Sequence, residues 1–184
     1  MQKTINFNDL ISEIKHDIND TAEVGFKRFI ASYIYNLSFR VLLNYRIGKY
    51  LSSSQSKVLR FIASRYKIRQ FTRYNCSISY NSIIGEGVRF AHPLGVVIGS
   101  GVVIKNHVTI WQQVTLGSTG RKNKELEYPI IGNNVKIYAG AKIIGGISIG
   151  ENAIIGANAV VLQNVPDNCI AVGIPARIID KRHI

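Results

Sequence analysis

Residues 131–166 read IGNNVK IYAGAK IIGGIS IGENAI IGANAV VLQNVP, six consecutive hexads that decide the fold. The first place of every hexad is Ile or Val, and the fifth is Val, Ala or Ile. Neither a helix nor an ordinary strand repeats every six residues. A fixed repeat with turn-forming Gly or Asn is typical of a solenoid, whose units bury their apolar side only by stacking on neighbours. We therefore predict a β-helix in which each hexad forms one side of a triangular coil.

The six-residue period begins near Ile78 and is interrupted twice. The next first-place aliphatic residue of the repeat after Phe90 is Ile98, eight residues on instead of six, so two extra residues are inserted around His92. The second interruption contains the polar, Gly-rich sequence GSTGRKNKELEYP at residues 117–129. Such a segment is unsuited to a coil wall, so we expect it to protrude as a loop.

Length and composition suggest one domain with a small appendage, because the chain has 184 residues. Its two cysteines, Cys76 and Cys169, make neither a disulfide framework nor a metal cluster. We expect a reducing, cytoplasmic setting and no metal. The N-terminus lacks the pattern of a secretory signal, and no apolar run reaches the roughly 18 residues of a membrane span.

We divide the chain into an N-terminal helical region, residues 1–75, and a β-helix domain, residues 76–184, whose last residues form a capping tail. Residues 1–24 carry a net charge of −3, from five acidic and two basic side chains. Hydrophobic residues at helical spacing predict a surface helix there, with Asn8 as a possible cap.

Residues 25–75 contain eleven Lys and Arg, no Asp or Glu, and many interleaved aromatic residues, in a chain of net charge +12. The hydrophobic spacing predicts two helices joined near residues 52–56. Three interpretations of this block stay open. The helices pack on the solenoid or a neighbouring subunit, they lie on an anionic membrane surface, or they bind nucleic acid. No nucleic-acid-binding motif accompanies the charge, so we expect no nucleic acid.

Two residues near the first interruption suggest chemistry. His92 lies two places past Phe90 and Gln112 two places past Ile110, so we expect them to stack on adjacent coils. Imidazole titrates near neutral pH, and a histidine at an insertion suits a general base. The alternative is a histidine that only caps a turn.

The two segments IIGEGVRFAHPLGVVIGSGVVIKNHVTIWQQVTLGSTG and PIIGNNVKIYAGAKIIGGISIGENAIIGANAVVLQNVPDNCIAVGIPARII together resemble the serine acetyltransferase branch of the hexapeptide-repeat acyltransferases. The resemblance covers about residues 76–179. It implies a left-handed parallel β-helix of hexapeptide repeats and a homotrimer. It also implies that acetyl-CoA binds as cosubstrate in the groove between neighbouring solenoids.

Site residues follow from the same resemblance, position by position. His92 matches the catalytic base. Gln112 matches a residue near the acceptor, and Tyr128 stands where the family holds its acceptor. The positions that match contacts to acetyl-CoA are Ser118, Thr119, Gly120, Ala139, Ala157 and Arg177.

Three positions depart from the family pattern. Ser77 and Ala91 stand where serine acetyltransferases have Asp, and Tyr128 stands where they have His. These changes remove groups that would bind or activate zwitterionic serine. Together with the short basic helical region, they make the chain resemble most the O-acetyltransferases of surface polysaccharide biosynthesis.

The sequence therefore predicts an acetyl-CoA-dependent O-acetyltransferase acting on a sugar hydroxyl, cytoplasmic and peripheral on the inner face of the membrane. One alternative is the L-serine O-acetyltransferase of cysteine biosynthesis. An alternative of another class is a noncatalytic trimeric scaffold.

Overall fold

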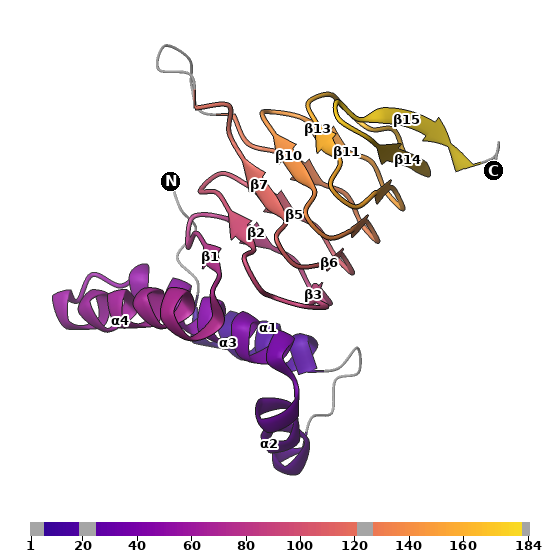
Figure 1. Cartoon of the computed structure of the whole chain (residues 1–184). Coiled ribbons are helices and arrows are strands. Elements are labelled where there is room, and N and C mark those ends of the chain that lie inside the picture. Colours follow the sequence, from indigo (N-terminus) through magenta and orange to yellow (C-terminus); the bar gives the residue numbers. More distant parts are fainter. Residues whose placement is uncertain (1–5, 19–24, 121–126, 182–184) are drawn as a thin grey trace.

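The protein consists of helices followed by a stack of triangular coils (Figure 1). The computed structural model describes residues 6–18, 25–120 and 127–181. Part of the expected 117–129 loop, residues 121–126, lies outside the described residues, as do residues 1–5, 19–24 and 182–184. The helices are α1 (Phe7–Ile18), α2 (Phe26–Tyr35), α3 (Leu37–Ser52) and α4 (Lys57–Tyr74).

Fifteen short strands form the three sides of the β-helix within these ranges. The first side pairs β1 (Ser77–Ile78), β4 (Val97–Ile98), β7 (Thr115–Gly117), β10 (Lys142–Ile144) and β13 (Val160–Val161). The second pairs β2 (Ile83–Ile84), β5 (Val103–Ile104), β8 (Ile130–Ile131) and β11 (Ser148–Ile149). The third pairs β3 (Arg89–Phe90), β6 (Thr109–Ile110), β9 (Lys136–Ile137), β12 (Ile154–Ile155), β14 (Cys169–Val172) and β15 (Arg177–Asp180).

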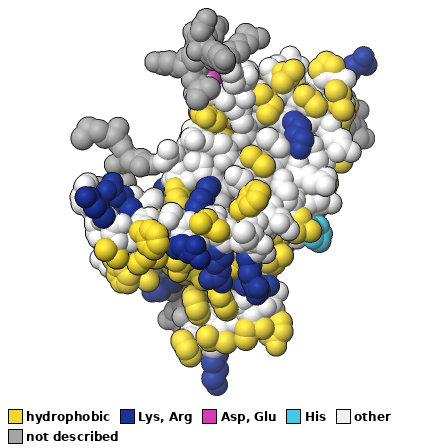
Figure 2. Space-filling view, turned by 60° about the vertical axis from the view of Figure 1, so that its left-hand side comes forward, with side chains coloured by type: hydrophobic (Ala, Val, Ile, Leu, Met, Phe, Trp, Pro, Cys, Tyr) yellow, Lys and Arg dark blue, Asp and Glu magenta, His cyan; other side chains and the backbone are white. Residues whose placement is uncertain are grey.

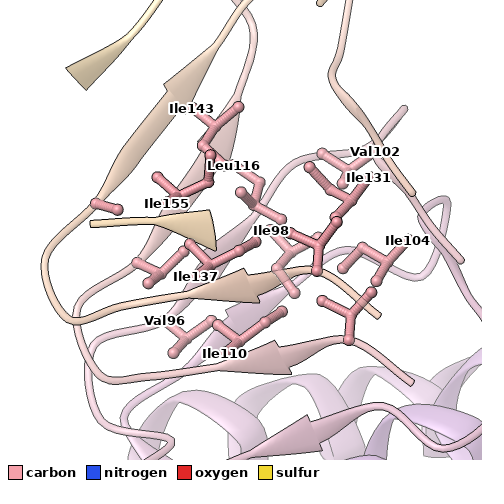
Figure 3. Close-up of a cluster of buried hydrophobic side chains, with 14 of the residues drawn as sticks. Val96, Ile98, Val102, Ile104, Ile110, Leu116, Ile131, Ile137, Ile143 and Ile155 are labelled. Carbon is pink, nitrogen blue, oxygen red and sulfur yellow. The ribbon is translucent and has the colours of Figure 1, made fainter. Parts of the chain in front are cut away.

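The first-place residues of the hexads form the core. Ile143 pairs with Val161, eighteen residues later, so three hexads complete one coil. Aliphatic side chains from all three sides meet on the axis of the coil and are at most 2% exposed (Figure 3). Burying each such side chain contributes about 1.5–3 kcal/mol, which makes the stack the main source of stability. The predicted period and its coil are confirmed.

Turn residues explain why asparagine recurs in the repeat. Asn134, Asn152 and Asn158 have φ angles of 57° or 58°, in the left-handed region. Asparagine tolerates this conformation better than most residues with a side chain. It therefore serves at these coil corners where glycine would otherwise be needed.

Two details of the predicted helices are wrong. The cap of α1 is Asn6 and not Asn8, because the Asn6 side chain accepts a hydrogen bond from Asp9 N at 2.8 Å. Residues 25–75 form three helices instead of two. Asn36 ends α2 and also caps α3, accepting from Phe39 N at 3.1 Å, and the periodic hydrophobic pattern concealed this break. None of the described helices is long and apolar enough to cross a membrane.

Arg46 joins the helices to the first coil. Its guanidinium is 2% exposed and donates to Asp17 at 3.1 Å, with Glu13 at 3.3 Å. It also donates to the carbonyl oxygens of Ile84 at 2.6 Å and Gly85 at 2.8 Å. The acidic segment predicted as a surface helix therefore supplies counter-charges to a buried arginine.

Replacing Arg46 by alanine is expected to lower the free energy of unfolding by about 3–5 kcal/mol, because a buried carboxylate loses its partner. Urea denaturation followed by circular dichroism measures the change. Lys27→Ala, at an exposed position of α2, is the control and is expected to change stability by less than about 0.5 kcal/mol. Equal stability of the two variants would contradict the conclusion that Arg46 joins the helices to the first coil.

Candidate functional site

His92 projects from the corner between the third and first sides of the β-helix, here named the His92 corner. Ala91 lies level with Trp111 on the next coil, because Phe90 pairs with Ile110 and Ala91 N donates to Ile110 O. Beyond the insertion, Gln113 N donates to Leu94 O, which brings Leu94 level with Gln112. The two inserted residues are therefore His92 and Pro93.

This register corrects one detail of the predicted column. Gln112, Ala139 and Ala157 follow one another on successive coils, linked by hydrogen bonds from Gly140 N to Gln112 O and from Asn158 N to Ala139 O. The residue level with them on the first coil is Leu94, and His92 bulges out just before it. The insertion is absorbed directly after Ala91, so the imidazole stands outside the regular wall.

The inserted turn is held by contacts with Cys76, just before β1, and with Ser38 of α3. The buried Cys76 thiol contacts the carbonyl oxygen of Pro93 as a hydrogen-bond donor. Burial raises the pKa of Cys76 to about 11, which keeps the thiol protonated for this role. Leu94 N donates to His92 O at 2.8 Å, and Phe90 N donates to Ser38 Oγ at 2.9 Å. The backbone that bears His92 is thus fixed between the first coil and α3.

The His92 imidazole itself is exposed and, within residues 6–18, 25–120 and 127–181, has no hydrogen bond or ion pair. Ser77, the position of the missing family Asp, lies in β1 and pairs with Val97. A serine there offers no charge to an imidazolium. The described part of the chain therefore leaves the imidazole free to meet a ligand.

Two further features line this corner. The rings of Trp111 and Tyr138 stack with centroids 4.5 Å apart at an angle of 22°. The side-chain oxygen of Gln112 is buried without a hydrogen-bond partner among the described residues. An unpartnered buried oxygen is costly, so it is suited to receive a donor from a bound molecule.

Arg177 lies at the far end of the same column. It begins β15 and pairs with Val172, next to Gly173, whose carbonyl accepts from Val160 N. Coils stack at about 4.8 Å, so the four steps from the His92 coil to this hairpin span about 19 Å. Along the His92 corner, His92 therefore lies at one end of an extended surface and Arg177 at the other, with Ala139 and Ala157 between them.

The predicted loop residues lie at another corner, between the first and second sides, here named the loop corner. Ser118 and Thr119 directly follow β7, and the Thr119 methyl group lies against Gly145. Gly120 has a φ of +67°. Within one chain, the structure does not bring these residues together with His92.

Tyr128 also lies at the loop corner, where its ring covers Gly99 and Gly101. A Cβ atom added to Gly101 would lie 2.4 Å from the Tyr128 ring, and one added to Gly99 would lie 2.6 Å from it. Pro129 O accepts from Val103 N at 3.2 Å. Inside one chain, Tyr128 anchors the returning end of the loop.

A pocket of about 880 Å³ borders His92 on the side of the helices. One wall is the segment Arg89–Leu94, and the other comes from the end of α2 and the start of α3. Among the described residues, the lining contains Arg28 and Arg89 and no Asp or Glu. This pocket could not be predicted from the sequence, because nothing in the hexad pattern indicates where the helices lie against the first coil.

Comparison with known proteins identifies the family. The family model "Bacterial transferase hexapeptide (six repeats)" matches residues 128–163. The solved soybean serine acetyltransferase apoenzyme superposes with a TM-score of 0.78 at 35% identity, covering 92% of this chain and 69% of that chain. The chain belongs to the serine acetyltransferase family. Its fold is accordingly a left-handed parallel β-helix with an N-terminal helical region.

Other members of the serine acetyltransferase family are similar over most of the chain. A structure named serine acetyltransferase in complex with CoA has a TM-score of 0.78 at 34% identity, covering 94% of this chain and 71% of that chain. Serine acetyltransferases of Buchnera aphidicola (from Schizaphis graminum) and Escherichia coli K12 are 39% and 37% identical over 94% and 88% of this chain. The chain spans only 66% and 58% of the length of these two curated relatives.

These names confirm the resemblance to the serine acetyltransferase branch. They give no support to the closer likeness expected to polysaccharide O-acetyltransferases, and they fit the alternative, an L-serine O-acetyltransferase, better.

Replacing Gly101 by alanine is expected to displace the Tyr128 ring and lower the free energy of unfolding by about 1–3 kcal/mol, the usual range for overpacking. Thermal unfolding measures it. Gly117→Ala, where the nearest atom is 3.8 Å from the added Cβ, is the matched control. Combining Gly101→Ala with Tyr128→Ala is expected to remove most of the penalty, and full additivity of the two changes would contradict the contact.

Proposed function

We propose that the protein is an acetyl-CoA-dependent O-acetyltransferase in which His92 is the general base. The single observation that supports this most is the exposed imidazole on an anchored two-residue insertion, at the head of a column of small residues. A turn-capping histidine would be hydrogen-bonded to its own turn, and no such bond is made by the described residues.

In the proposed reaction, the neutral imidazole accepts the proton of an acceptor hydroxyl as that oxygen attacks the thioester carbonyl of acetyl-CoA. A new C–O bond forms, the C–S bond of the tetrahedral intermediate breaks, and the imidazolium returns the proton to the departing thiolate. The products are the O-acetyl ester and CoA. The transfer is direct, with both substrates bound together.

Acetyl-CoA is proposed to lie along the His92 corner. Ala139 and Ala157 keep the wall shallow, so that the pantetheine arm approaches the backbone, and Arg177 lies near the nucleotide end. Ser118, Thr119 and Gly120 are proposed to contact the same cosubstrate from a second chain. The complex with CoA named for a solved relative supports this cosubstrate.

A homotrimer is proposed, because one chain does not hold the whole site. His92 lies at one corner of the β-helix, and Ser118, Thr119, Gly120 and Tyr128 lie at another, so a site that includes both sets needs two copies. In this arrangement Tyr128 and Gln112 would contact the acceptor from neighbouring chains.

Two acceptors are proposed for the test. L-serine is favoured by the names of the relatives. A sugar hydroxyl of a surface glycan is the second candidate. It is favoured by the lining of the pocket beside His92, whose described residues include no carboxylate to hold the ammonium group of serine.

Replacing His92 by alanine is expected to lower the rate of acetyl transfer about a hundredfold to ten-thousandfold, the usual contribution of a general base. Release of the CoA thiol measures the rate. The control is His107→Asn, because His107 has a φ of 58° that asparagine tolerates. Full activity of the His92 variant would refute the mechanism.

The acceptor is decided by the same assay with L-serine, neutral sugars, sugar nucleotides and glycan repeat units. Turnover of free serine alone would exclude the glycan. Lack of CoA release with every acceptor would favour the noncatalytic scaffold over both.

We further propose that the helical region lies on the anionic cytoplasmic face of a membrane. Hydrophobic and basic side chains intermingle over the helical end of the molecule (Figure 2). On α4, Val58, Phe61 and Phe71 are 67–69% exposed, among basic residues and without a nearby acid on α2, α3 or α4. Anionic lipid complements this charge, and the exposed rings suit the headgroup layer.

The double reversal Arg60→Glu with Arg73→Glu is expected to weaken binding to phosphatidylserine vesicles at least tenfold, since each basic residue contributes about 1 kcal/mol. Vesicle sedimentation at low salt measures the binding. The matched control, Lys105→Glu with Lys136→Glu, makes the same charge change on the β-helix and is expected to bind nearly as well. No binding of the unaltered protein at low salt, or equal loss in both variants, would refute membrane docking.

A further inference from the structure

The described residues that line the pocket beside His92 include basic side chains and no acidic ones. Its lining includes Arg28, from α2, and Arg89, from β3. Tyr35, Asn36 and Ser38 also line it. The volume of about 880 Å³ is within the usual range for small-molecule sites.

Arg89 is held where it can serve such a pocket. Its neighbour Phe90 is bonded on both sides, to Ser38 Oγ through its amide and to β6 through the pairing of β3 with β6. The side chain of Arg89 points out of the coil and is exposed. Among the described residues no carboxylate forms an ion pair with it, so its charge is not neutralised within the chain.

The buried Arg46 and the exposed Arg89 differ in their ion pairs. Arg46 has two carboxylates, Glu13 and Asp17, within 3.3 Å. Arg89 has none among the described residues. Helix α1 therefore supplies the carboxylates that neutralise Arg46. The charge of Arg89, beside His92, is not neutralised by the described residues.

We propose that Arg89 binds an anionic group of the acceptor, a carboxylate or a phosphate, while His92 takes the proton from its hydroxyl. This assignment rests on the function proposed above and names the class of acceptor. Guanidinium groups bind carboxylate and phosphate oxygens through paired hydrogen bonds. The described residues of the lining offer no carboxylate for an ammonium group, so L-serine would be held there through its own carboxylate alone.

The proposal predicts a preference between molecules that differ only in charge. Glucose 1-phosphate is expected to bind the full-length protein more tightly than glucose, and 3-hydroxypropionate more tightly than 1,3-propanediol. Isothermal titration calorimetry measures binding without requiring turnover. Comparison of the two anions tells a phosphate-bearing acceptor from a carboxylate-bearing one, and inorganic phosphate is expected to compete with both.

Arg89→Gln is expected to weaken binding of both anionic probes about tenfold and to leave the neutral probes unchanged. Arg89→Lys, which keeps the charge, is expected to retain binding within about threefold. The matched control is Lys136→Gln. Lys136 occupies the same register position as Arg89 two coils away, since Arg89 pairs with Thr109 and Thr109 with Lys136.

Equal binding of charged and neutral probes, or equal loss in the Arg89 and Lys136 variants, would overturn the proposal. The two hypotheses fail separately. Acetyl transfer that favours neutral acceptors and is insensitive to Arg89→Gln would leave the acetyltransferase standing and remove the anion subsite. Anion binding that depends on Arg89, without acetyl transfer to any acceptor, would do the reverse.

Discussion

The structure depends on one constraint, that each coil buries its aliphatic side chains only against the coils before and after it. Ile98, Leu116 and Ile143 lie above one another because parallel pairing fixes the register of each side. A residue's place in its hexad therefore determines its corner and whether it points in or out. Function follows from departures from the repeat, since only residues outside the regular wall can project toward a substrate.

The sequence allowed the β-helix, its coil length and the position of both interruptions to be predicted, because these depend on local periodicity. It also led to the prediction that His92 and Gln112 stack on adjacent coils. The structure instead places Leu94, two residues after His92, level with Gln112. Spacing counts the inserted residues but does not tell where along the turn the backbone regains its register, which here depends on hydrogen bonds from Ala91 and Gln113.

Relations between distant segments were beyond prediction. In the sequence, nothing distinguishes Arg46 from the ten other basic residues of residues 25–75. In the structure it is 2% exposed and paired with carboxylates about thirty positions earlier. The pocket beside His92 depends likewise on how α2 and α3 meet β3. The division at residues 75 and 76 and the roles given to the site residues stay predictions.

Arg46 also has a consequence for how copies of the protein behave toward one another. A stack of parallel coils ends in unpaired backbone groups, and such an edge is a template for adding another chain. At the first coil, the carbonyl oxygens of Ile84 and Gly85 are already occupied by Arg46. At the other end, β15 runs antiparallel to β14, so the parallel series is closed by a strand of opposite direction. Both features disfavour end-to-end growth of the β-helix into a fibre. Arg46 occupies two carbonyl oxygens at one end, and the β14–β15 hairpin closes the third side at the other.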